Sequence, residues 1–182
     1  ATVFDVSQTE GKELPTLGVT RLTGDVENFA AIYDKLTSLS PVPVEIDICP
    51  GEANGYFSSM ENRIVLRPGM SQIQTVKTLV HEIAHAKLHD AKNIPPEERK
   101  QRREKEVEAE SIAYVVCQHF GIDTSEYSFG YVAGWSRGKE MNELKSSLDQ
   151  IHSTAGEIIA ALDDTCMVHT QVKSKPTPQF AR

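Results

Sequence analysis

The chain has 182 residues, of which 39% are hydrophobic and 25% charged, so it can form one globular domain with a buried core. A formal net charge of −7 argues against direct nucleic-acid binding by this segment, because phosphate binding needs a basic surface. No apolar run approaches the length of a membrane span, no signal peptide is visible, and the three cysteines include no C-x-x-C pair. The composition therefore predicts a cytoplasmic protein without membrane contact.

The N-terminal part predicts an arm followed by a helix. Residues 1–24 favour an extended arm or linker, because short apolar runs are separated by a polar stretch. The chain begins without Met, so we expect either a trimmed protein or a piece of a longer one. A helix is predicted across residues 26–39, with Asp25 as its N-cap. Its buried stripe consists of Phe29, Ile32, Tyr33 and Leu36.

Three strands and a second helix are predicted next. Residues 44–48 alternate between apolar and acidic side chains, which indicates a half-buried strand. Residues 55–58 and 62–66 favour two paired strands around a short polar turn. Ser71 is a suitable N-cap for the following helix, which is expected to run to about Lys92.

The remaining elements are predicted to be helical. Residues 95–120 indicate one helix, which begins at prolines that suit a first turn and is stopped by Gly121. Residues 128–136 predict a short aromatic helix, and residues 138–163 a last amphipathic one. The side chains expected to point inward from the last helix are Met141, Leu144, Leu148, Ile151, Ile158 and Leu162.

These elements predict an α+β protein with one main domain. The arm at residues 1–24 precedes a domain at residues 25–164. A tail at residues 165–182 is expected to be flexible or docked on a partner, because it is polar and rich in Lys and Pro.

The most informative motif is the His-Glu-Ile-Ala-His of residues 81–85, an H-E-x-x-H in an apolar, helical stretch. On a helix His81 and His85 lie one turn apart on the same face, so both rings can bind one metal ion. Glu82 then lies beside the metal, where it can act as a general base. This arrangement predicts a hydrolytic Zn2+ site, which needs a third protein ligand.

Three acids downstream could supply that ligand: Glu106, Glu108 and Glu110. At about 100° per residue, Glu106 falls in the middle of an apolar helical stripe, Glu110 at its margin and Glu108 on the far side. The stripe consists of Ala109, Ala113, Val116, Cys117 and Phe120. We therefore expect Glu106 to bind the metal, Glu110 to hydrogen-bond a ligand as its outer partner, and Glu108 to be solvated.

Two further roles stay open at the level of sequence. His89 lies one more turn along the face of the two histidines, and could be a ligand, a hydrogen-bond donor to a ligand, or a helix-end cap. The helix-end, structural role is favoured. Tyr114, Tyr127 and Tyr131 are candidates for a group that stabilises a developing oxyanion, and nothing in the sequence selects one.

Several segments resemble known families. The His-Glu-Ile-Ala-His-Ala-Lys-Leu-His of residues 81–89, followed by the Glu-Val-Glu-Ala-Glu-Ser-Ile-Ala of residues 106–113, resembles the ImmA/IrrE-type metallopeptidases. The Val-Phe-Asp-Val-Ser-Gln-Thr of residues 3–9 and the Tyr-Ser-Phe-Gly-Tyr-Val-Ala-Gly-Trp of residues 127–135 are similar to the C-terminal peptidase part of ArdC-like antirestriction proteins. The likeness covers roughly residues 1–160.

The resemblance implies a gluzincin-like zincin fold, in which a small twisted antiparallel or mixed sheet packs on a helical bundle containing the motif helix. It implies zinc ligands at His81, His85 and Glu106 and a base at Glu82. ArdC-like proteins place a single-stranded-DNA-binding domain before the peptidase, and no such domain is recognised in this segment. The family pattern has Asn or Asp where this chain has Glu110.

Residues and resemblance together predict a zinc-dependent endopeptidase that cleaves a protein substrate, in a regulatory role linked to a mobile element or antirestriction. An extended substrate is expected to pair with the strand around residues 55–57. The alternative is a zinc-binding module of the peptidase fold with little activity, within a larger protein that binds single-stranded DNA. A helical protein with a chance motif would bind no metal.

Overall fold

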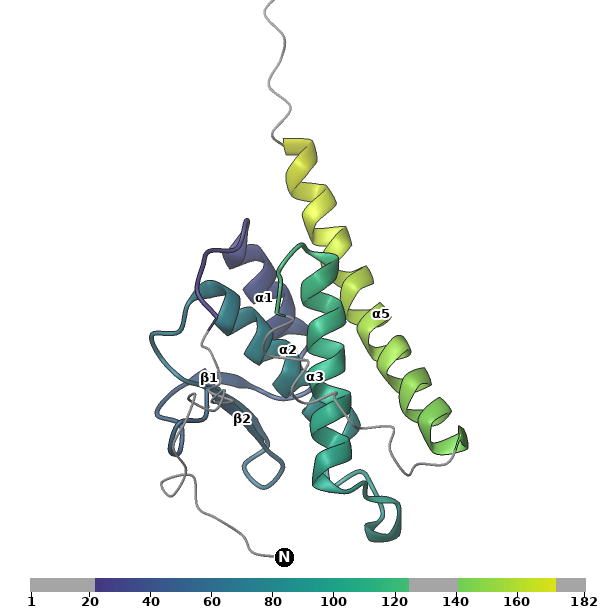
Figure 1. Ribbon diagram of the computed structural model, residues 1–182. Helices are drawn as coiled ribbons and strands as arrows, with labels where there is room; N and C mark the ends of the chain where they lie inside the picture. The colour runs from purple at the N-terminus through teal and green to yellow at the C-terminus, as the bar shows by residue number, and fades with distance from the viewer. Residues whose placement is uncertain (1–21, 125–140, 173–182) are drawn as a thin grey trace, which may run out of the picture.

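The computed structural model describes residues 22–124 and 141–172, with side chains described from 143 to 163 in the second range. Within these ranges a small three-stranded mixed sheet lies beside four α-helices (Figure 1). This confirms the predicted α+β class. Residues 1–21 of the predicted arm at residues 1–24 and the aromatic segment at residues 128–136 lie outside the described residues. No described helix has the length and apolar character that crossing a membrane requires.

The sheet has the strand order β1-β3-β2. Strand β1 (Val44–Ile46) pairs in parallel with β3 (Arg63–Leu66), and β2 (Gly55–Ser58) pairs with β3 in antiparallel fashion. The predicted pair of strands around a polar turn is therefore confirmed. Since β2 is an outer strand of this sheet, its second edge has no strand partner among the described residues.

The first predicted strand is only partly correct. Strand β1 stops at Ile46, and the side chains of Ile46 and Ile48 are 62% and 83% exposed instead of half-buried. The helix that covers the sheet contacts β2 and β3, and among the described residues no further strand pairs with β1 at its other edge. The alternating pattern identified residues that share a face but could not tell whether that face would be covered.

Helix α1 (Phe29–Leu39) begins later than predicted. Asp25 is not its N-cap; that position is taken by Asn28, which has a left-handed φ of 57° and makes no side-chain cap. The backbone N–H of Val26 instead donates to the side chain of Gln72 at 2.8 Å, which holds this segment outside the helix. The predicted apolar stripe is nevertheless confirmed, with Ile32 and Leu36 buried.

Helix α2 (Gln72–Leu88) is the central element, because it contacts α1, α3, β2 and β3. The Ser71 hydroxyl accepts a hydrogen bond from the Gln74 N–H at 3.1 Å, which confirms the predicted N-cap. The helix ends at Leu88, before the predicted Lys92. Its end is fixed by Asp90, whose carboxylate accepts hydrogen bonds from the Lys92 N–H and the Ser59 hydroxyl.

Helix α3 (Arg102–His119) does not begin at the prolines. A separate 3₁₀ helix, Pro96–Glu98, precedes it, and the guanidinium of Arg99 donates to the backbone carbonyls of Ala91 and Ile94 in the loop before that 3₁₀ helix. The predicted single helix over residues 95–120 is thus wrong at its start. Its end is correct, since Gly121 has a φ of 72° and closes the helix with the two hydrogen bonds of a Schellman motif.

Helix α5 (Met141–Val172) runs alongside α3 and extends past residue 163, where the prediction ended it (Figure 1). Among the residues expected to point inward, Leu148 is 55% exposed. The buried face is instead centred one residue earlier, because α5 packs on both α3 and α1. That face consists of Ser147, Ile151, Thr154, Ala155, Ile158 and Leu162.

Candidate metal centre

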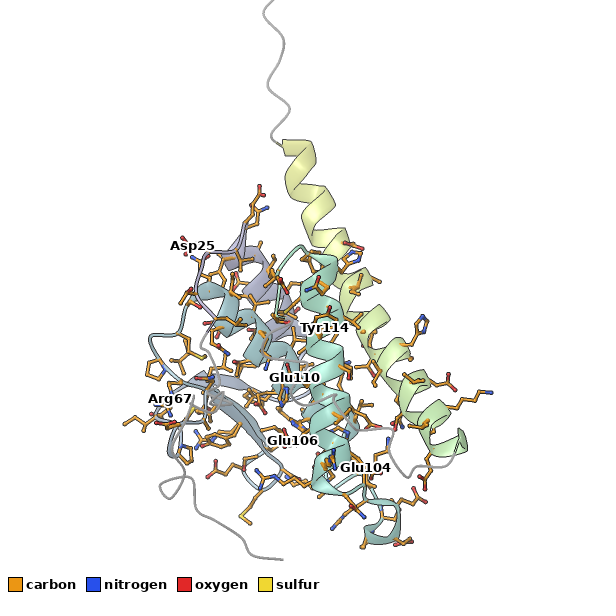
Figure 2. All side chains as sticks on the ribbon, in the orientation of Figure 1. Asp25, Arg67, Glu104, Glu106, Glu110 and Tyr114 are labelled. Atoms are coloured by element: carbon orange, nitrogen blue, oxygen red, sulfur yellow. The ribbon has the colours of Figure 1, made fainter. Side chains whose placement is uncertain are left out.

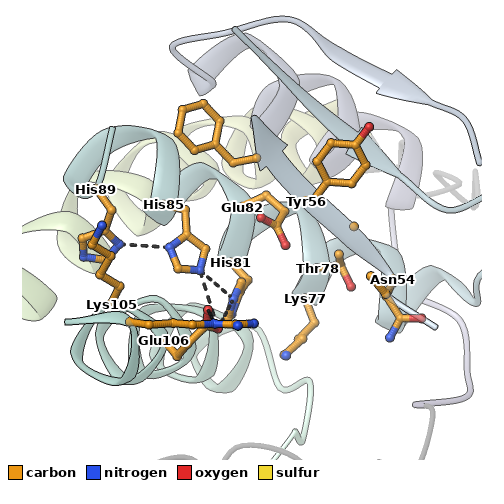
Figure 3. A pocket seen from close by; sticks show the side chains of 14 residues that line it. Asn54, Tyr56, Lys77, Thr78, His81, Glu82, His85, His89, Lys105 and Glu106 are labelled. Atoms are coloured by element: carbon orange, nitrogen blue, oxygen red, sulfur yellow. Dashed lines mark hydrogen bonds and ion pairs between the residues drawn. The ribbon is translucent and has the colours of Figure 1, made fainter. Parts of the chain in front are cut away.

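His81, His85 and Glu106 meet at one point between α2 and α3 (Figure 3). The two Nε2 atoms lie 3.1 Å apart. A carboxylate oxygen of Glu106 lies 3.6 Å from Nε2 of His81 and 3.8 Å from that of His85. One ligand atom from each residue therefore falls within 4.8 Å of the others, a suitable arrangement for holding a single metal ion.

Small residues allow the two helices to approach closely enough for this geometry. Ala84 of α2 and Ala109 and Ala113 of α3 are all fully buried. Glu106 and Glu110 lie one turn apart on α3 (Figure 2), and the structure places both on the side that faces α2, as the helical stripe predicted. The position of Glu106 thus agrees with the argument from periodicity.

Glu110 lies behind His81, on the side away from the proposed metal position. Its carboxylate is fully buried, and one oxygen lies 3.0 Å from Nδ1 of His81 and 2.6 Å from Nζ of Lys77. Burial opposes its ionisation, but the hydrogen bond from His81 and the charge of Lys77 together lower the pKa of Glu110 to about 2. The carboxylate is therefore ionised and fixes the ring orientation of His81.

His89 lies behind His85 in a comparable way. Its Nδ1 is 3.0 Å from Nδ1 of His85, and its Nε2 is 2.9 Å from a carboxylate oxygen of Glu108. His89 is also the C-cap residue of α2, so it combines a helix-end position with contact to a proposed ligand. Burial lowers the pKa of His89, which favours the neutral ring.

The expectation that Glu108 is solvated is wrong. Its side chain is fully buried, and its second oxygen accepts a hydrogen bond from Lys100, which also contacts Gln150 of α5. Helix α3 packs against α2 on one side and α5 on the other, so it has two buried faces. A single apolar stripe describes only one of them, and Glu108 lies where both helices close over α3.

The protonation of the metal-free centre fits a cation site. Burial alone would lower the pKa of His81, but hydrogen bonds with Glu106 and Glu110 outweigh it and raise the pKa to about 9. The histidines in turn hold the pKa of Glu106 well below its ordinary value. Two imidazole nitrogens and a carboxylate form the donor set of a catalytic zinc site, and a metal cation could replace the protons they share.

Glu82 faces the same space as the three ligands. It lies on α2 directly after His81, is only 7% exposed, and lines a pocket of about 500 Å³ (Figure 3). Strand β2 forms one wall of this pocket, α2 its floor, and the first turn of α3 the opposite wall. The pocket opens next to the candidate metal position and gives room for a bound substrate.

Residues that the sequence reasoning passed over also surround the centre. Lys77 is buried one turn before His81, and its spacing of four residues from His81, which puts both on one helix face, was the available signal. Tyr56 and Asn54 of the β2 region line the pocket, whereas Tyr114, an expected oxyanion candidate, does not. The other two candidates, at positions 127 and 131, lie outside the described residues.

Comparison with known proteins points in the same direction. Residues 49–129 match the M78 peptidase family model, described as an IrrE N-terminal-like domain. An uncharacterized protein of Bacillus anthracis, pXO2-81, is 32% identical over 173 residues, which cover 88% of this chain.

The chain spans only 26% of the length of that relative. No solved structure matches the chain significantly. The matched region contains both motif histidines, Glu82 and Glu106, so the family model and the geometry concern the same site. Residues 49–129 of this chain are thus similar to the IrrE N-terminal-like domain of the M78 peptidase family.

Proposed function

We propose that this chain is a zinc-dependent endopeptidase that hydrolyses peptide bonds in a protein substrate. The observation that carries the proposal is the meeting of His81, His85 and Glu106 beside Glu82 in one pocket. The M78 family match over the same residues supports a metallopeptidase. The chemistry of the donor set favours zinc over magnesium or calcium, which prefer oxygen ligands.

The residues of the chain have separate tasks in this reaction. Zinc held by His81, His85 and Glu106 would acidify a water molecule and polarise the scissile carbonyl. Glu82 would accept a proton from the attacking water and donate it to the amine of the leaving product. Glu110 holds the ring of His81 through its Nδ1–H.

Strand β2 is the element that would align the substrate. Its outer edge borders the pocket, so an extended peptide can add to the sheet through backbone hydrogen bonds. Gly55 permits this strand to lie close to α2, because a Cβ there would come within 2.7 Å of Thr78 and 3.0 Å of the Val65 carbonyl oxygen. Any side chain at position 55 would push the strand away from the floor of the pocket.

The biological role is part of the same proposal. We infer regulatory proteolysis linked to a mobile element or to antirestriction, on the likeness of residues 3–9 and 127–135 to ArdC-like proteins. A longer parent protein is consistent with the short share of the Bacillus anthracis relative that this chain spans. In that setting a domain outside this chain would bind single-stranded DNA.

A pair of measurements tests the proposal. Elemental analysis of the purified chain should find about one zinc per chain, and chelation should abolish cleavage of an unfolded protein such as casein. Glu82→Gln should keep the zinc and the fold but lose cleavage by a factor of about 10³ or more. If Glu82→Gln keeps full cleavage, Glu82 is not the base. If neither protein cleaves any substrate although zinc is bound, the alternative of a zinc-binding module with little activity holds.

A further inference from the structure

The pocket wall formed by α3 carries two cations, Arg102 and Lys105, that are not candidate metal ligands. Arg102 lies 4.0 Å from Glu106, and its side chain is 94% exposed. Lys105 lines the same pocket and has no ion pair among the described residues. By contrast, Lys77 on the floor of the pocket is bound to Glu110 at 2.6 Å. Arg102 and Lys105 therefore remain available to a ligand.

The helix macrodipole does not explain these cations. Arg102, Arg103 and Lys105 all lie at the start of α3, where the helix macrodipole makes positive side chains unfavourable. The nearby acid, Glu106, directs one carboxylate oxygen toward the two histidines, and its other oxygen lies 4.0 Å from Arg102. The chain as a whole has a net charge of −7, so a concentration of positive charge at one pocket wall is not a property of its general surface.

The other charges of the pocket strengthen the preference for an anion. The two carboxylates that line it are Glu82 and Glu106. In the proposed function Glu106 is a ligand of a dication and Glu82 holds a proton in transfer, so neither neutralises the α3 wall. A divalent cation beside them adds further positive potential in a partly enclosed space.

We propose that the substrate carries an acidic side chain next to the scissile bond, and that Lys105 and Arg102 bind its carboxylate. The inference rests on the proposed peptidase function. A peptide aligned on β2 lies between that strand and α3, on which Figure 3 shows Lys105 and Glu106 across the histidines from Tyr56. Side chains that flank the bond are then within reach of two long and flexible cationic side chains.

Three degenerate peptide pools test this inference. The pools are identical except that they hold Glu, Gln or Lys at the central position. Cleavage by the zinc-loaded protein is followed by mass spectrometry. Binding of dye-labelled pools to zinc-loaded Glu82→Gln protein is followed by fluorescence anisotropy, which needs no turnover.

We expect the Glu pool to be cleaved and bound about three- to tenfold better than the Gln pool, and the Lys pool least well. The double variant Arg102→Glu with Lys105→Glu should reverse this order. Arg103→Glu is the matched control, because Arg103 is exposed and does not line the pocket. It should leave the order unchanged. High salt should weaken the preference of the wild type.

The outcomes separate this inference from the proposed function. Preferential binding of the Glu pool without any cleavage supports the acidic site and contradicts the peptidase. Cleavage with equal use of the three pools supports the peptidase and contradicts the acidic site. The acidic site is also contradicted if no pool binds, if the double variant keeps the wild-type order, or if Arg103→Glu reverses it. Thermal unfolding and zinc content, measured for each variant, show that the proteins compared are folded and loaded.

Discussion

The two motif histidines are supported in different ways. His81 is backed by a compact ion pair, Glu110 with Lys77, which lies entirely between α2 and α3. His85 is backed by a longer chain in which His89 contacts Glu108, and Lys100 then connects Glu108 to Gln150 of α5. The first support is part of the core, whereas the second links the candidate metal centre to the C-terminal helix.

The difference has an energetic consequence. Glu110 and Lys77 are 0% and 3% exposed, so removing either one takes a close counter-charge away from a buried charge. Glu108 is equally buried, but its partner Lys100 is 28% exposed and can reach water. We therefore expect substitutions in the pair behind His81 to lower the free energy of unfolding most. Substitutions among the side chains behind His85 should mainly lower metal affinity.

The largest effect is predicted for Lys77→Met. It keeps the volume of the side chain but leaves Glu110 buried without its ammonium partner, which should cost about 3–5 kcal/mol of the free energy of unfolding. Urea denaturation of the metal-free protein measures it. Lys87→Met is the matched control, because Lys87 pairs with Glu157, which is 57% exposed, and should cost under about 1 kcal/mol. Equal losses in the two variants would contradict a special role for the buried pair.

The next effect concerns metal binding on the two sides. Glu108→Gln and Glu110→Gln keep the shape of the side chain but weaken its hold on a histidine, so each should lower zinc affinity about 10- to 100-fold. Competition with a chromogenic chelator measures the affinity. Glu157→Gln, at an exposed position, should leave it unchanged. If Glu108→Gln behaves like this control, the chain through His89 does not support the metal centre.

The pH dependence of the metal-free protein should distinguish the two sides. The folded-state pKa of His81 is raised to about 9, so its stabilising contribution is complete below its ordinary pKa of 6.5 and is lost as the pH rises through about 9. The pKa of His89 is lowered by burial, so its contribution is present above 6.5 and is lost as the pH falls.

Thermal unfolding at a series of pH values measures these two losses, and the rise of the His81 pKa from 6.5 to about 9 corresponds to an alkaline loss of about 3 kcal/mol. His89→Gln should remove the loss on the acid side and keep the loss on the alkaline side. An unchanged acid-side loss in this variant would assign it to another group. Bound zinc should suppress the alkaline loss, because the metal takes the place of the proton on His81.

The smallest effect is predicted for Gln150, the last residue in the series of hydrogen-bonded side chains behind His85. Gln150→Ala removes one hydrogen-bond acceptor of Lys100, at a cost of about 0.5–1 kcal/mol and a reduction of zinc affinity by about two- to threefold. Isothermal titration with zinc measures the affinity, and urea denaturation measures the cost in stability. Gln118→Ala is the control. It removes a hydrogen bond with Asp123, which is not one of the side chains behind His85, and it should leave zinc affinity unchanged. If Gln150→Ala leaves zinc affinity unchanged, α5 does not contribute to the support of His85, and only residues of α2 and α3 and the loop between them do.

Sequence alone determined the features that depend on local periodicity and turn chemistry. The spacing of His81 and His85 places them on one helix face, and the stripe on α3 selects Glu106, which the structure brings to both histidines. Ser71 and Gly121 mark helix ends correctly, because a cap or a left-handed residue acts through its own neighbours.

Only the tertiary structure decided which helix is buried on two faces and which strand keeps an exposed face. Glu108 was expected in solvent and is buried, because α5 closes over the second face of α3. Ile46 was expected inside and is exposed, because α2 covers the other strands. Periodicity reports which residues share a face, whereas burial depends on partners from distant parts of the chain. The support of His85 depends on such a partner, so no local pattern could reveal it.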